Sequence, residues 1–128
     1  ERFGHTGTHP AYHDISISNA IDYYVMLGPK RKEDRLRYLN NLWTKPLRNN
    51  NKIILNTPDN PKRYAAIANV GITGISPSEL SNILFEKYKI FCVAIDRPGV
   101  RGCRITPNVF TSENEIISFR NALLEIAS

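Results

Sequence analysis

The segment Arg101-Gly102-Cys103-Arg104-Ile105-Thr106-Pro107-Asn108-Val109-Phe110-Thr111 combines a short strand, a proline stop and the approach to a helix. The period of two along the strand places Cys103 and Ile105 on one face, and Arg104 and Thr106 on the other. We expect the strand to be buried, and an unpaired guanidinium away from water is costly, so Arg104 needs an anionic partner. A ligand carboxylate matches the planar fork of arginine. The commoner alternatives are a surface arginine or one paired with a structural Asp or Glu.

The segments around this strand carry clear helix and strand signals. Ser112 with Glu115 makes a capping box that opens a final helix, and Ser76 with Glu79 makes another, with Pro77 at the first helical position. Apolar and β-branched runs predict strands at 52–56, 64–72, 90–95 and 102–106. Apolar residues at helical spacing predict two further helices, at 14–27 and from 29 to about 47.

The resulting order is helix-helix-strand-strand-helix-strand-strand-helix. This order predicts an α+β fold, an α/β sandwich in which about four mostly antiparallel strands are covered by helices on one side. We assign residues 1–50 to a helical arm and residues 51–128 to the α+β domain. The two N-terminal helices carry more apolar surface than this sheet needs, so we expect them to pack on something outside it.

Composition narrows the function classes. With 128 residues, 41% of them hydrophobic and 23% charged, the chain fits a folded domain with an arm, and it shows no run long enough for a membrane span and no secretion leader. We therefore expect a cytoplasmic protein. The net charge of +5 is spread along the chain, which does not favour nucleic-acid binding, although that function stays an alternative.

The cysteines and histidines give weak signals. Cys92 and Cys103 lie in apolar runs and are predicted to be core residues rather than a disulfide. His5, His9 and His13 are spaced by four, but the proline after His9 and the nearby glycines disfavour a helix there, so we predict no metal site.

Two motifs resemble the class V aminotransferase family, which uses pyridoxal 5'-phosphate (PLP) and has fold type I. The family ends in a G-x-R-[IV]-[ST]-P-x-x-[YF]-[TN] segment, which Gly102–Thr111 matches, and its arginine binds the substrate α-carboxylate; the resemblance assigns that role to Arg104. The family also has a Gly-Thr that reaches the PLP phosphate of the neighbouring subunit, which implies that Gly7 and Thr8 are cofactor-binding residues. The resemblance extends over nearly the whole chain and is nearest to the isopenicillin N epimerase-like members.

The resemblance implies that the chain is the C-terminal small domain of a homodimeric enzyme acting on an amino acid. The lysine that bonds PLP and the aspartate that pairs with its ring should lie upstream, so the chain alone should be inactive, with no catalytic residue of its own. Desulfurases of this group need a cysteine on a loop before the arginine, and 95–100 contains none. The alternative is a non-catalytic α+β module that binds a ligand or a protein.

Overall fold

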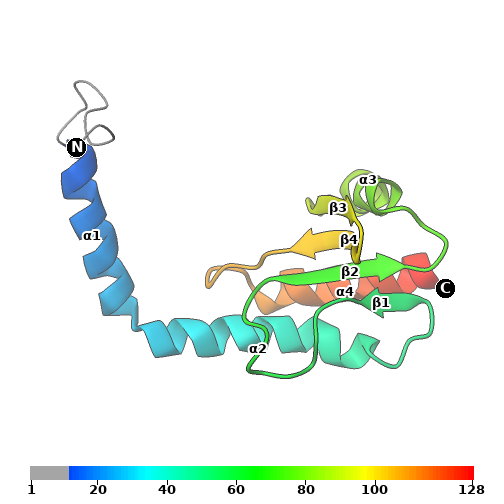
Figure 1. Cartoon of the computed structure of the whole chain (residues 1–128), viewed down its shortest axis with the longest axis horizontal. Coiled ribbons are helices and arrows are strands. Elements are labelled where there is room, and N and C mark those ends of the chain that lie inside the picture. The colour runs from blue at the N-terminus through cyan, green and yellow to red at the C-terminus, as the bar shows by residue number, and fades with distance from the viewer. Residues whose placement is uncertain (1–11) are drawn as a thin grey trace. The chain divides into compact units, whose positions relative to one another are not determined.

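The computed structural model describes residues 12–128, which form helices and strands in the predicted order (Figure 1). The elements are α1 (Tyr12–Leu27), α2 (Pro29–Leu47), β1 (Ile53–Leu55), β2 (Ala68–Ile72), α3 (Pro77–Tyr88), β3 (Val93–Arg97), β4 (Val100–Ile105) and α4 (Glu113–Ala127). The chain forms two compact units that divide after Lys32.

In the first unit, α1 buries none of its side chains. Large apolar side chains are exposed around the helix, among them Ile15, Ile21 and Met26. The helix ends where the sequence predicts: Gly28 has a φ of +82°, and its N–H donates to the carbonyl of Val25 at 3.0 Å. A left-handed residue at this point is the common way to end a helix.

In the second unit, the four strands form one antiparallel sheet in the order β1-β2-β4-β3. β2 and β4 are the inner strands. In the register, Asn69 of β2 lies opposite Arg104 of β4, and Val93 of β3 lies on the other side of Arg104. The predicted α+β class and antiparallel sheet are confirmed.

The core lies on one face of this sheet. Side chains from α2, α3 and α4 join side chains from the sheet in a single buried cluster, so the three helices cover the same face, and α4 runs behind the sheet in Figure 1. The fully enclosed members include Leu39, Trp43, Val70, Cys103 and Leu123. The second helix, grouped with the arm from sequence, thus supplies Leu39 and Trp43 to the core.

The predicted helix caps form. At α4, the Ser112 hydroxyl accepts the Glu115 N–H and the Glu115 carboxylate accepts the Ser112 N–H, which completes the box. At α3, the Ser76 hydroxyl accepts the Glu79 N–H, with Pro77 at the start of the helix.

Two strand predictions need correction. The strand predicted at 64–72 begins only at Ala68, because side chains of α2 take the carbonyls before it: Arg37 donates to Tyr64, and Asn40 donates to Ala65 at 3.1 Å. The strand predicted at 90–95 begins at Val93, because the N–H of Ile90 instead donates to the carbonyl of Leu84 and closes α3.

Candidate functional site

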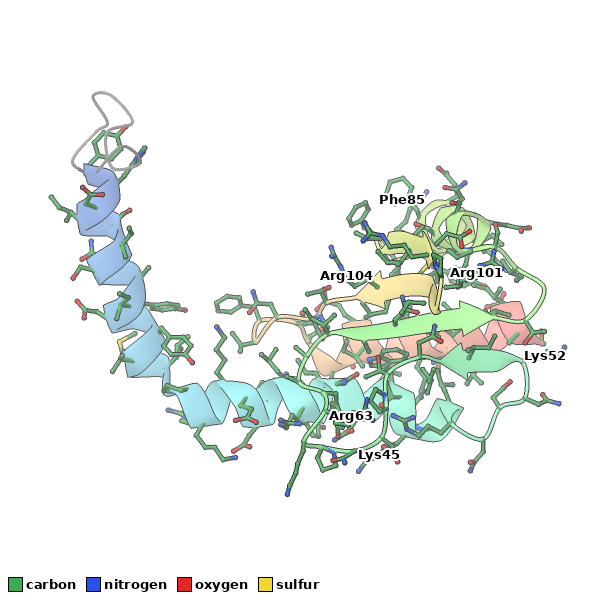
Figure 2. All side chains as sticks on the ribbon, viewed as in Figure 1. Lys45, Lys52, Arg63, Phe85, Arg101 and Arg104 are labelled. Carbon is green, nitrogen blue, oxygen red and sulfur yellow. The ribbon has the colours of Figure 1, made fainter. Side chains whose placement is uncertain are left out.

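Arg104 lies near the C-terminal end of the inner strand β4 and points away from the helices. Its neighbour Cys103 is fully buried in the core, whereas Arg104 is exposed, as the alternation predicts (Figure 2). The expectation of a buried strand arginine is wrong. The helices cover only one face of the sheet, so its other face, which we call the open face, lies toward solvent in this unit.

The guanidinium of Arg104 has no hydrogen bond or ion pair with any residue in the range 12–128. Arg101, on the same strand, differs: its Nε lies 2.8 Å from Asp96 Oδ1, and the pKa of Arg101 is raised by that hydrogen bond. Arg35, Arg37 and Arg48 also have carboxylate partners. Arg104 is therefore an exposed cation on an inner strand, without a carboxylate partner in 12–128.

Polar side chains gather beside Arg104 on the open face. Asn56 Nδ2 donates to Asn69 Oδ1 at 2.6 Å and to the backbone carbonyl of Arg101 at 2.9 Å. The Asn69 N–H donates to Thr57 Oγ1 at 2.9 Å. Sequence reasoning missed this group, although an asparagine inside a strand such as β2 is uncommon and was a usable signal.

Two glycines of the inner strands adjoin a cavity that reaches α3. Gly71 of β2 and Gly102 of β4 line this cavity of about 390 Å³, together with Ile54, Arg101, the residues before α3, and Pro77 and Leu80 of α3. A methyl group on Gly102 would lie 2.4 Å from the carbonyl oxygen of Val70, so this position has no space for a side chain.

Two thiols lie on the core side of the sheet. Cys92 and Cys103 are both buried and free, as predicted. Hydrogen bonding between them lowers the pKa of the Cys92 thiol to about 7 and raises the pKa of Cys103. Cys103 also donates to the carbonyl of Pro77 at 3.4 Å, so it faces α3 and not the open face.

The connection before β4 is short. Arg97 pairs with Val100, so Pro98 and Gly99 alone make the turn, and Gly99 has a φ of +84°. Proline followed by a left-handed glycine is the pattern of a type II turn. This two-residue turn contains no cysteine.

The described residues do not by themselves fit a covalently held PLP. Each lysine in 12–128 is exposed or half-buried, and two are engaged on the surface: Lys52 Nζ donates to the Ser128 carbonyl at 2.6 Å, and Lys87 pairs with Glu125. The predicted phosphate contacts, Gly7 and Thr8, lie outside the described residues, as do His5 and His9. Within 12–128, no group of three His, Cys, Asp or Glu side chains is placed to hold a metal ion, and no helix has the length and apolarity to cross a membrane.

Comparison with known proteins supports the resemblance seen in the sequence. No family model matches the chain. The chain is similar to isopenicillin N epimerase of Streptomyces clavuligerus, with 27% identity over 96% of this chain, and it spans about a third (33%) of the length of that relative.

The fold also has a counterpart among solved structures. The apo structure of a cysteine desulfurase from Thermococcus onnurineus NA1 superposes with a TM-score of 0.71, covering 84% of this chain and 28% of that protein. At 22% identity the likeness concerns the fold alone.

Proposed function

We propose that the chain is the C-terminal domain of a PLP-dependent enzyme of the class V aminotransferase type, and that Arg104 binds the α-carboxylate of an amino-acid substrate. One observation supports this most: Arg104 is an exposed arginine with no partner in 12–128, and it stands at the arginine position of the family motif. The similarity to an isopenicillin N epimerase supports the amino-acid class of the substrate.

In this proposal the chain's task is to bind and orient. Two parallel N–H···O bonds from one guanidinium fix both the position and the plane of a carboxylate. Binding the carboxylate in this way fixes the orientation of the substrate Cα relative to the cofactor. Such orientation raises the rate of reaction as well as the affinity for the substrate. PLP, when bound, supplies the electron sink for chemistry at that carbon.

The remaining parts of the site lie elsewhere in the proposal. The chain spans a third of its curated relative, and none of its described lysines is enclosed, so the lysine that bonds PLP comes from another part of the polypeptide. Gly7 and Thr8 contact the phosphate across a homodimer interface. The enzyme works in the cytoplasm, and this chain alone has no activity. Whether the reaction is transamination, epimerisation or a lyase reaction depends on residues outside the chain.

The first experiment is on the native polypeptide. Its intact mass should exceed the 14.6 kDa of this chain, and the purified protein should show the visible absorbance of bound PLP. A native mass equal to that of this chain, without colour even after PLP is added, contradicts the proposal and favours the non-catalytic binding module.

The second experiment tests Arg104 in the PLP-containing protein. Arg104→Ala should weaken amino-acid binding by at least about tenfold, the size expected for losing a charged hydrogen-bond pair, while PLP stays bound. Arg63→Ala is the matched control, since Arg63 is also exposed but lies on the loop between β1 and β2, beside α2 in Figure 2. Loss of PLP in Arg104→Ala, or unchanged amino-acid binding, refutes the assignment.

A further inference from the structure

Asn69 lies where it can reach the same ligand as Arg104. The two residues are directly opposite each other on neighbouring antiparallel strands. The Cβ atoms of such a pair are about 4.5–5.5 Å apart and point to the same face of the sheet. The side-chain amide of Asn69 is therefore within reach of a small anion that the Arg104 guanidinium holds.

The hydrogen bonds around Asn56 fix which way the Asn69 amide points. The Arg101 carbonyl can only accept, so the end of Asn56 that lies 2.9 Å from it must be the NH2 group. The same NH2 group lies 2.6 Å from the side chain of Asn69, so the atom it meets there must be an oxygen. Asn69 thus uses its oxygen toward Asn56, and its own NH2 group is left to point elsewhere.

Gly102 allows this placement. A Cβ atom at position 102 would lie 2.6 Å from Asn69 Oδ1, so the Asn69 side chain occupies the space that any other residue at 102 would fill. The backbone of Asn69 is held as well: its N–H donates to Thr57 Oγ1, and its carbonyl accepts the Asn56 N–H at 3.1 Å. The amide is therefore fixed before any ligand arrives.

No hydrogen bond from the Asn69 NH2 group to another residue of 12–128 is formed, and the same holds for the Arg104 guanidinium. A carboxylate has about four acceptor positions, of which a bidentate arginine fills two. The two sets of donors therefore complement one carboxylate.

We propose that Asn69 donates a side-chain N–H to the carboxylate that Arg104 binds, so that the ligand is held by a two-residue clamp whose asparagine is oriented by Asn56. This inference rests on the proposed carboxylate-binding function of Arg104. Val93 lies on the other side of Arg104 and has no hydrogen-bond donor in its side chain, so Arg104 has the polar Asn69 on one side and the apolar Val93 on the other.

The neutral variant Asn69→Ala tests the ligand contact, because it removes the NH2 group without adding a charge beside Arg104. Asn69→Asp keeps an oxygen to accept from Asn56, but it places a negative charge beside Arg104 that repels an anion whether or not Asn69 contacts it. If Asn69 binds the ligand, Asn69→Asp should therefore reduce affinity by more than Asn69→Ala does, by about tenfold or more.

The test is a titration of the isotope-labelled 128-residue chain with acetate, followed by NMR, with chloride at equal ionic strength as the reference. We expect the Asn69 side-chain NH2 and the Arg104 Nε–H resonances to shift together, with one dissociation constant. Asn69→Ala should weaken binding by roughly three- to tenfold. Asn121→Ala is the matched control, because this exposed amide lies on α4, away from the open face.

The outcomes distinguish the two proposals. If Arg104 shifts with acetate but Asn69→Ala binds within about twofold of the wild type, the clamp is wrong and the role of Arg104 stands. If neither resonance responds to acetate beyond its response to chloride, the clamp is wrong, and Arg104→Ala in the PLP-containing protein decides the role of Arg104 separately.

Discussion

The indole of Trp43 and the phenyl ring of Phe119 meet edge to face, with centroids 5.1 Å apart and ring planes at 71°. Trp43 lies on α2 and Phe119 on α4, and both are buried, so this contact joins two of the helices that cover the sheet. Edge-to-face pairs add about 0.5–1.5 kcal/mol to the gain from burial.

Phe119→Ala should therefore destabilise the fold by about 3–5 kcal/mol, since it removes a buried ring and leaves a cavity beside Trp43. Urea unfolding followed by the fluorescence of Trp43, the single tryptophan of the chain, measures this directly. Phe85→Ala is the control: Phe85 is half exposed on α3 and should change stability by about 0.5 kcal/mol or less. Equal losses in the two variants would contradict the packing described here.

Gly102→Ala should destabilise the chain through a steric clash and also through backbone strain, since Gly102 has a φ of +154°. The added methyl group would lie 2.4 Å from the Val70 carbonyl oxygen and 2.6 Å from Asn69 Oδ1, and the sheet must move to admit it. We expect a loss of about 1–3 kcal/mol from overpacking, together with displacement of the Asn69 amide.

Gly74→Ala shows the cost of backbone strain without a clash. Gly74 has a φ of +83°, but no atom lies within 4 Å of a Cβ built there, so its substitution should cost only the conformational term, about 1 kcal/mol. Thermal unfolding of both variants compares the two effects, and the Asn69 side-chain resonance should move in Gly102→Ala alone. A shift of that resonance in Gly74→Ala would argue against a local clash.

The capping box at α4 should make stability depend on pH. The Ser112 N–H and hydroxyl both donate to the Glu115 carboxylate and lower its pKa below the usual 4.5. A carboxylate with a depressed pKa contributes stability above its unfolded-state pKa, and this contribution is lost as the pH falls through the folded-state value. Wild type should therefore exceed Glu115→Gln in unfolding temperature at neutral pH, and the difference should shrink as the pH drops below about 4.5.

Ser112→Ala supplies the control, because it removes the donor hydroxyl and the cap for the Glu115 N–H. When Glu115→Gln is added to Ser112→Ala, the further drop in unfolding temperature at neutral pH should be smaller than the drop that Glu115→Gln causes in the wild type. The backbone N–H of residue 112 still donates to Glu115 in Ser112→Ala, so part of the pH dependence should remain there, and a pH dependence that is unchanged in Glu115→Gln would mean that another carboxylate causes it.

The order of elements was predictable because the starts of α3 and α4 have a local chemical signal. Ser76 and Ser112 cap these helices through bonds to residues three positions away, which a sequence displays directly. The alternation of side chains along β4 could also be predicted from the sequence, and it placed Cys103 and Arg104 on opposite faces of the sheet.

The errors involve partners distant in sequence. The start of β2 was misplaced because Arg37 and Asn40 of α2 bind the carbonyls of 64 and 65, a contact that no local pattern indicates. The exposure of Arg104 depends on which face the helices cover, and the proposed role of Asn69 depends on its register opposite Arg104. Those relationships arise only once the sheet has formed.

The place of Arg104 on an inner strand also bears on when its backbone opens. β4 is hydrogen-bonded to β2 on one side and to β3 on the other, whereas β1 and β3 are the outer strands of the sheet. Amide protons in such a doubly bonded strand exchange slowly, because they are released only when most of the unit unfolds. Arg104 therefore lies on one of the two inner strands, whose amide protons should exchange more slowly than those of the outer strands, and its backbone should stay in place when either outer strand opens.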